Sequence, residues 1–250
     1  MTTRPPHTLN PDTIEALVFD LMGTCCDWKS GILSTLARTP SLQALSDNDR
    51  SRLADDWRSG FFNEIHAQFE AGAPPEDIDV THRRVLDRIL AQRRLDAMTE
   101  DERRALVGRW HEQLAWPDTI NAIERLKEKF KVVVLANGTT RLQLDIVKSS
   151  GIPFHTLFSS QLLQLTKPDP AIYYKAFELL QIPPEKSIMV AAHAYDLRAA
   201  KKVGMKTVYI RRDTEDVDED MDRIRKEVDV FLEGSAHDRG PMEKLADLLL

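Results

Sequence analysis

Residues 16–24 read ALVFDLMGT and have the pattern of a buried strand that ends at a charged residue. Four apolar residues are followed at once by Asp20, and a charged side chain directly after a buried strand needs a partner or a function, because burying it alone is costly. Gly23 permits a tight turn whose backbone N–H groups can face an anion, and the Thr24 hydroxyl can hold the carboxylate. A cap for the following turn is the alternative interpretation of Asp20.

Further apolar runs indicate more strands of the same sheet. Val, Ile, Leu, Phe and Ala occur in them without alternation, as in strands covered on both faces. The runs are Ala16–Phe19, Lys131–Ala136, Ser187–Ala192 and Thr207–Ile210, with a shorter strand near Val228–Leu232. Three helical stretches alternate with them and end at glycine or proline: Arg141–Ser149, Pro170–Leu180 and Leu197–Val203. A last helix is expected from about Pro241. The alternation predicts an α/β fold with a doubly wound, Rossmann-like parallel sheet.

The region after the first strand has a different pattern. It lacks β-branched runs and reads as amphipathic helices, with N-cap signals at Ser46–Asp49 and Thr99–Glu102. We therefore predict an inserted all-helical cap domain. The expected parts are an α/β catalytic core of residues 12–28 and 115–250, a helical cap of residues 29–114, and a flexible N-terminus of residues 1–11.

The composition excludes several classes of protein. With 250 residues, 42% of them hydrophobic, the chain can bury a sizeable core, and its net charge of −6 argues against a nucleic-acid partner. No apolar run approaches the ~18 residues of a membrane helix, so no membrane partner is expected. The first residues are polar and proline-rich, so we do not expect a secretory signal there, and Cys25 and Cys26 are adjacent and give no disulfide framework. We expect a reducing, cytoplasmic setting.

Polar residues gather at the expected carboxyl ends of the strands, where open parallel sheets bind their ligands. Asp20 follows the first strand, Asn137 follows the second, and His193 and Asp196 follow the third. Lys167 stands just before a helix. Their common edge predicts an active site. The acidic stretch 213–222, in contrast, reads as a solvated loop or a helix entrance.

Four segments, in order, resemble the motifs of the haloacid dehalogenase superfamily: Phe19–Thr24, Leu135–Gly138, Lys167–Asp169 and the segment ending in Asp196. The helical insertion after the first motif matches the cap of that superfamily, so the resemblance covers the chain from about Glu15. It implies that Asp20 is the nucleophile and that Lys167 and Asp196 are its catalytic partners.

Met22 distinguishes two branches of this superfamily. The phosphatases carry a second aspartate here as a general acid and bind Mg²⁺ nearby, whereas a thioether cannot donate a proton and is a poor ligand for a hard cation. The type II L-2-haloacid dehalogenases carry an apolar or aromatic residue at this position and use no metal. The resemblance therefore implies a hydrolase that acts on carbon–halide bonds of short-chain L-2-haloacids, with no cofactor and no metal.

The resemblance also implies residues of the pocket. Arg58 matches an arginine of the dehalogenase cap, with a solvated helix arginine as the alternative. Tyr173 matches another pocket residue, with core packing as the alternative. The other substrate-binding candidates, several of them through backbone N–H groups, are Leu21, Met22, Thr24, Trp57 and Asn137.

The chain departs from the dehalogenase pattern at three positions. Ala136 and Ala191 stand where serines are usual, and His193 stands where an asparagine is usual. The lost hydroxyls make His193 a candidate to accept a proton from water near pH 7, beside or instead of Lys167. A histidine that only caps the strand end is the alternative.

The mechanism implied is attack of Asp20 on C2, release of halide, formation of an aspartyl ester, and hydrolysis with one inversion at C2. Arg58 stabilises the departing halide or pairs with the substrate carboxylate. The expected partners are a small 2-haloacid substrate and a halide product. A homodimer is a possible assembly. A Mg²⁺-dependent phosphatase and a catalytically silent binding protein of the same fold are the alternatives.

Overall fold

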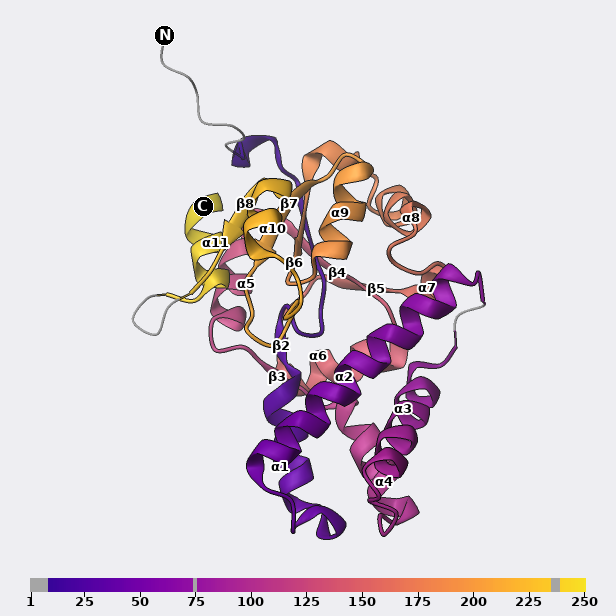
Figure 1. Cartoon of the computed structure of the whole chain (residues 1–250). Helices are drawn as coiled ribbons and strands as arrows, with labels where there is room; N and C mark the ends of the chain where they lie inside the picture. The colour runs from indigo at the N-terminus through magenta and orange to yellow at the C-terminus, as the bar shows by residue number, and fades with distance from the viewer. Residues whose placement is uncertain (1–8, 74–75, 235–238) are drawn as a thin grey trace. The chain divides into compact units, whose positions relative to one another are not determined.

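The computed structural model describes residues 9–73, 76–234 and 239–250 (Figure 1). The chain divides into two compact units, one of Met1–Cys26 with Ala115–Leu250 and the other of Asp27–Leu114. Residues 1–8 of the N-terminus that we expect to be flexible lie outside the described residues.

The first unit is built on a parallel sheet with the strand order β5-β4-β1-β6-β7-β8. Its strands are β1 (Ala16–Phe19), β4 (Lys131–Ala136), β5 (Thr156–Ser159), β6 (Ser187–Ala191), β7 (Lys206–Ile210) and β8 (Val230–Leu232). In the centre, β1 pairs with β4 and β6, which places Phe19 opposite both Val134 and Val190. The predicted doubly wound fold is confirmed, and only the edge strand β5 was not expected.

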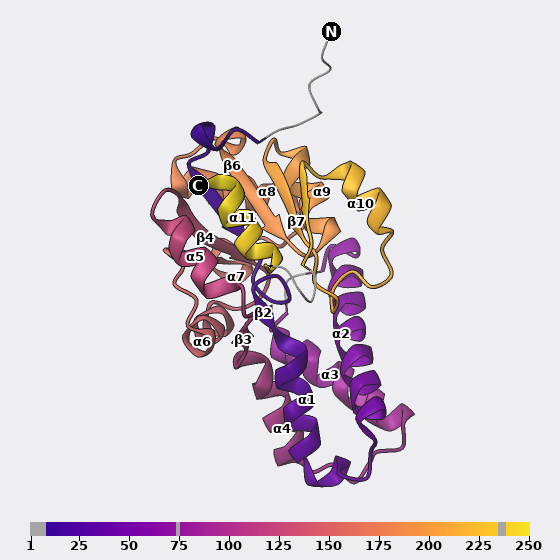
Figure 2. The same cartoon turned by 90° about the vertical axis from the view of Figure 1, so that its left-hand side faces the viewer.

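Helices cover both faces of this sheet (Figure 2). On one face α5 (Thr119–Lys127) packs against α11 (Pro241–Leu249), and on the other α8 (Pro170–Leu180) packs against α9 (Ala194–Lys202). This arrangement follows from right-handed crossovers, because the chain reverses its direction across the sheet after β5. The unit also contains η1 (Pro11–Thr13), α6 (Thr140–Ser150), α7 (Ser160–Leu163), η4 (Pro184–Lys186) and α10 (Met221–Glu227).

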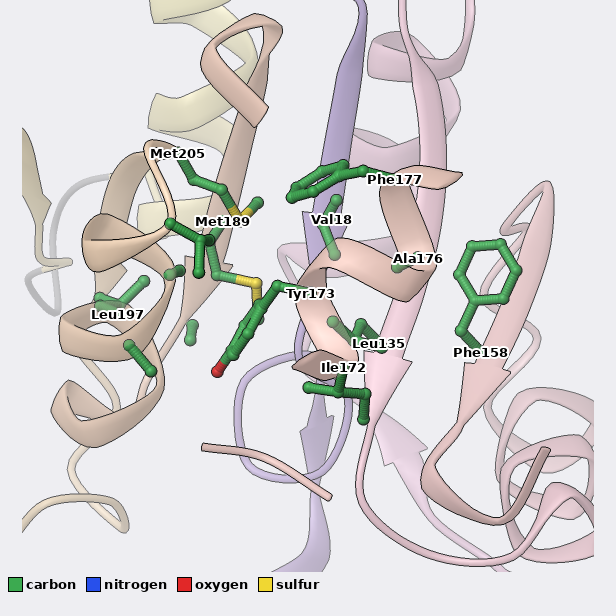
Figure 3. Close-up of a cluster of buried hydrophobic side chains, with 14 of the residues drawn as sticks. Val18, Leu135, Phe158, Ile172, Tyr173, Ala176, Phe177, Met189, Leu197 and Met205 are labelled. Carbon is green, nitrogen blue, oxygen red and sulfur yellow. The ribbon is translucent and has the colours of Figure 1, made fainter. Parts of the chain in front are cut away.

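A cluster of buried side chains joins the sheet to α8 and α9 (Figure 3). Val18, Leu135 and Met189 come from the strands, and Tyr173 and Leu197 from the two helices. Figure 3 shows the Tyr173 ring among these side chains, with its hydroxyl group pointing away from them. The cluster therefore fixes a polar group at the edge of an apolar core.

The second unit is helical, as predicted. It contains α1 (Trp28–Arg38), η2 (Pro40–Leu42), α2 (Asp47–Glu70), α3 (Ile78–Gln92), α4 (Glu100–Gly108) and η3 (Arg109–His111). The expected N-cap signals both form, since Thr99 and Glu102 make a capping box and Ser46 accepts a hydrogen bond from the N–H of Asp49. The short strands β2 (Cys26–Asp27) and β3 (Leu114–Ala115) form a separate two-stranded sheet. Within the part of the chain that the structure describes, no helix is long and apolar enough to cross a membrane.

Candidate active site

Asp20 lies at the carboxyl end of β1, where the strand order reverses between β4 and β6. Such switch points are the usual ligand sites of open parallel sheets. The residue is only 6% exposed. Gly23, with φ of +83°, turns the chain back so that the Thr24 hydroxyl donates to Asp20 Oδ2 at 2.7 Å. The same hydroxyl accepts the N–H of Ala192 at 2.9 Å, so this turn holds one carboxylate oxygen in place.

Lys167 bridges two buried carboxylates. Its Nζ lies 2.9 Å from Asp20 Oδ1 and also donates to Asp196 Oδ2. Burial alone would lower the pKa of Lys167, but the charges of Asp196 and Asp20 outweigh it and hold that pKa above its ordinary value. In turn, burial would raise the pKa of Asp20, yet Lys167 and His193 hold it well below its ordinary value. Asp20 is therefore an ionised carboxylate in a nearly dry site.

Two further predicted residues hold this network rather than line an open surface. The Tyr173 hydroxyl donates to Asp196 Oδ1 at 2.5 Å, and the Tyr173 side chain is fully buried. The side-chain amide of Asn137 donates to the Lys167 carbonyl at 3.0 Å and accepts the Lys167 N–H at 2.8 Å. Tyr173 therefore orients the Asp196 carboxylate, and Asn137 orients the backbone of Lys167. Contacts of Tyr173 and Asn137 with substrate stay a prediction.

His193 lies between two carboxylates. Its Nδ1 is 3.0 Å from Asp20 Oδ2, and its Nε2 is 2.7 Å from Glu215 Oε2. Burial opposes protonation of the ring, but the hydrogen bonds and charges of Asp20 and Glu215 raise the pKa of His193 to about 10. From the sequence we expect a neutral imidazole near pH 7. The resting site instead holds an imidazolium, since both ring nitrogens face carboxylates.

The contacts of His193 also bear on the alternative that this residue is only a cap. The residue occupies the N-cap position of α9, but its side chain makes no capping hydrogen bond. The N–H of Ala194 is instead bound by the Asp216 carboxylate at 2.6 Å. The imidazole is therefore directed to Asp20 and Glu215 and not to the end of the helix.

Glu215 also belongs to the site, because it contacts His193, although the sequence did not indicate it as a candidate. It lies in the loop after β7, is 2% exposed, and accepts a hydrogen bond from the Thr214 hydroxyl at 2.9 Å. A Cβ atom at Gly23 would come within 2.4 Å of the Glu215 Cδ, so the glycine makes room for this carboxylate. The predicted solvated loop is wrong for Glu215, whereas the predicted helix entrance is confirmed by α10, whose N-cap is Asp220. The available signal for Glu215 was its place in the loop that follows β7, at the edge where the other site residues gather.

In the helical unit, Arg58 is 6% exposed and is not a solvated helix arginine. Its guanidinium lies 4.3 Å from the ring centroid of Phe62 and 5.3 Å from that of Trp28. Such contacts with aromatic faces hold a cation while leaving its planar fork intact. Trp57 is fully buried in the same unit and donates from Nε1 to the His82 carbonyl at 2.9 Å. The roles of Arg58 and Trp57 toward substrate stay a prediction.

A divalent metal ion does not fit these donors. Each carboxylate oxygen of Asp20 and Asp196 already accepts an N–H or O–H group. Two of the donors, Lys167 and His193, are cationic, and Met22 offers only a soft thioether. Within residues 9–73, 76–234 and 239–250, no group of three or more His, Cys, Asp or Glu side chains could hold a metal.

A comparison with protein families shows which family has this arrangement. The family model described as "haloacid dehalogenase-like hydrolase" matches residues 14–204. The chain belongs to this family. The resemblance drawn from the four motifs is therefore confirmed, and the switch-point carboxylate of this haloacid dehalogenase-like hydrolase is the one that the first motif marks.

Individual relatives refine the position within the family. The (S)-2-haloacid dehalogenase 4A of Burkholderia cepacia is 28% identical over 209 residues, which cover 80% of this chain and 84% of that protein. The crystal structure of the L-2-haloacid dehalogenase PA0810 matches with a TM-score of 0.78 and 30% identity, over 95% of this chain and 100% of that one. The glyceraldehyde 3-phosphate phosphatase of Methanopyrus kandleri is 31% identical, but over 47% of this chain and 57% of that protein. The similarity over most of the chain is thus to the L-2-haloacid dehalogenase-like branch.

Proposed function

We propose that this protein is a metal-independent hydrolase of short-chain (S)-2-haloacids, in which Asp20 displaces the halide. One observation carries the proposal. Asp20 is buried and ionised between Lys167 and His193, and the residue two positions later is Met22, which cannot protonate a leaving group. A halide leaves as a stable anion and needs no proton, whereas a leaving alkoxide does. The relatives named (S)-2-haloacid dehalogenases support the same substrate class.

In the first step, an Asp20 carboxylate oxygen attacks C2 of the substrate from the side opposite the halogen. The carbon–halogen bond breaks, the halide leaves with the electron pair, and an ester joins Asp20 to the substrate. Arg58 stabilises the departing halide or the substrate carboxylate, because a guanidinium binds either anion. Backbone N–H groups of Leu21, Met22 and Asn137 hold the carboxylate and, when the ester is hydrolysed, the oxyanion that develops on it.

In the second step, water attacks the Asp20 carbonyl carbon, and the bond between that carbon and the ester oxygen breaks. The product is a 2-hydroxy acid with one inversion at C2, and the carboxylate of Asp20 is restored. Lys167 stays paired with the Asp196 carboxylate, whereas His193 loses one of its two carboxylate partners when Asp20 becomes an uncharged ester, which favours His193 as the group that accepts the proton of water. Lys167 then serves to keep Asp20 ionised and to hold Asp196.

Halide release tests the proposal. Wild type and Asp20→Asn are incubated without metal, in the presence of a chelator, with each enantiomer of 2-chloropropionate. Wild type should release chloride from the (S) enantiomer and form (R)-lactate, and Asp20→Asn should release none, because the amide is a far weaker nucleophile. Chloride release that requires Mg²⁺, or a racemic product, would contradict the mechanism.

A phosphatase is the second candidate, favoured by the partial match to a phosphatase of the same superfamily. Turnover of p-nitrophenyl phosphate that depends on Mg²⁺, with no halide released from any short haloacid, would promote it. If neither reaction occurs, a silent binding protein with this fold is the better description.

A further inference from the structure

We propose that Glu215 is the positioning residue for hydrolysis of the Asp20 ester: it holds the Nε2–H of His193, so that Nδ1 faces the ester and accepts a proton from the attacking water. This inference rests on the proposed function and assigns a role within it to a residue from a separate loop.

The geometry supports this role because Glu215 is built into the site. His193 Nε2 lies 2.7 Å from Glu215 Oε2, and the two side chains are 5% and 1% exposed. The other Glu215 oxygen accepts the Thr214 hydroxyl at 2.9 Å, which fixes the orientation of the carboxylate. Gly23, in the turn after Asp20, leaves the space that this carboxylate fills. A carboxylate held from two sides fixes the tautomer of the imidazole it binds.

The opposite side of the ring faces the nucleophile. His193 Nδ1 lies 3.0 Å from Asp20 Oδ2, so this nitrogen is beside the carboxyl group that becomes the ester. The other groups near the ring are Asp216, whose carboxylate binds the N–H of Ala194, and Tyr195, whose ring centroid is 5.9 Å away. On the Nε2 side of the ring, Glu215 Oε2 lies within hydrogen-bond distance, at 2.7 Å.

Alkylation of Asp20 changes the charge on one side of the ring only. At rest, two carboxylates hold the imidazolium, and the pKa of His193 is about 10. The ester carries no charge, so the ring loses one partner and its Nδ1 proton passes to solvent, while Glu215 retains the proton on Nε2. The resulting neutral imidazole presents the Nδ1 lone pair beside the ester. The resting imidazolium thus becomes a base only after the first step.

The proton balance of the second step follows from this state. The water oxygen bonds to the Asp20 carbonyl carbon, and its proton moves to His193 Nδ1. When the ester bond breaks, the departing alkoxide takes that proton and becomes the hydroxyl group of the product. The proton of the regenerated Asp20 carboxyl group then returns to His193. The overall reaction converts haloacid and water to hydroxy acid, halide and one proton.

Glu215→Gln tests the role directly, because it removes the charge and nearly preserves the shape. We expect the pKa of His193, measured by NMR titration of the ring, to fall by at least about one unit, as for loss of one charge partner. With (S)-2-chloropropionate we expect a burst of about one chloride per site, followed by turnover slowed about 100-fold. Mass spectrometry of the quenched enzyme should find the ester on Asp20.

Asp213→Asn is the matched control, since it removes the same charge from the same loop at a fully exposed side chain. It should leave the pKa of His193 and the turnover unchanged. Thr214→Val, which removes only the hydroxyl bond to Glu215, should shift both readouts less and in the same direction, and it serves if Glu215→Gln does not fold.

The outcomes separate this inference from the proposed function. Wild-type turnover and no trapped ester in Glu215→Gln would overturn the role of Glu215 while leaving the dehalogenase proposal in place. An unchanged pKa of His193 in that variant would overturn it as well. Absence of chloride release by wild type would overturn the dehalogenase proposal itself.

Discussion

The ammonium of Lys167 lies 2.9 Å from the Asp20 carboxylate, and neither side chain is more than 9% exposed. The same ammonium binds Asp196, so one cation serves two buried acids. Removing one partner of a buried ion pair leaves the other charge uncompensated, which is far more costly than the net contribution of the pair. The network is therefore expected to control both the stability of the core unit and the ionisation of its nucleophile.

Lys167→Met should destabilise the protein by about 3–5 kcal/mol, because Asp20 and Asp196 lose their shared cation. The free energy of unfolding, measured with urea, checks this. Lys175→Met is the control, since Lys175 pairs with Glu178 at the surface and its loss should cost less than ~1 kcal/mol. Equal losses in the free energy of unfolding would show that the buried network stabilises the protein no more than a surface ion pair.

His193→Ala should leave the first step intact and stall the second. Asp20 keeps Lys167 as a cationic partner and can still be alkylated, whereas the attacking water loses its base. We expect one equivalent of chloride in a burst, an ester on the peptide that contains Asp20, and a steady-state rate lower by about 100-fold or more. Full turnover by this variant would assign activation of water to Lys167 instead.

Gly23→Ala should both strain the backbone and displace Glu215. The φ of +83° costs a non-glycine residue about 1 kcal/mol, and the new Cβ would lie 2.4 Å from the Glu215 Cδ. Gly204→Ala is the matched control: its φ is +98°, but its nearest neighbour is Pro184 Cβ at 3.8 Å. Both variants should lose stability in urea unfolding, and only Gly23→Ala should lose dehalogenation. Equal activity of the two variants would contradict the close packing of Gly23 and Glu215.

His82 should make the helical unit sensitive to acid. The ring is fully buried, stacks on Phe61 at 4.0 Å and on Trp110 at 4.3 Å, and within the described residues neither of its nitrogens has a hydrogen-bond partner. Burial, with a smaller contribution from the charge of Arg58, holds the pKa of His82 well below its ordinary value of 6.5.

The sign of the effect follows from that pKa. Above pH 6.5 the ring is neutral in both folded and unfolded chains, and below it the unfolded chain binds a proton that the folded chain refuses. Stability should therefore fall between pH 6.5 and 5 by up to about 1.4 kcal/mol per pH unit from this group. His82→Phe should remove that part of the slope in urea unfolding. An unchanged slope in His82→Phe would contradict the burial of a neutral ring.

Much of the core could be predicted from sequence because it depends on local signals. The run Lys131–Ala136 is apolar after its first residue and forms β4 with the same bounds, and Thr99–Glu102 forms the capping box that its spacing indicates. The strand Thr156–Ser159 was missed because it is short, lies at the sheet edge and begins with an exposed threonine.

The site was less accessible to sequence analysis, because its chemistry depends on contacts between distant segments. The charge state of His193 is set by Asp20, 173 positions earlier, and by Glu215, 22 positions later. The composition of the acidic loop does not distinguish the buried Glu215 from neighbours such as the fully exposed Asp213. Only the return of the chain after β7 to the carboxyl edge of the sheet brings that carboxylate to the ring.

A single turnover in ¹⁸O-labelled water, with enzyme in excess over (S)-2-chloropropionate, tests directly whether an ester forms on Asp20. The hydroxyl oxygen of lactate then comes from Asp20, and the oxygen of water enters the carboxyl group of Asp20. If Asp20 is the nucleophile, lactate should be unlabelled and the peptide that contains Asp20 should carry the ¹⁸O label. Labelled lactate with an unlabelled Asp20 would show that water attacks the substrate directly and would contradict an aspartyl ester.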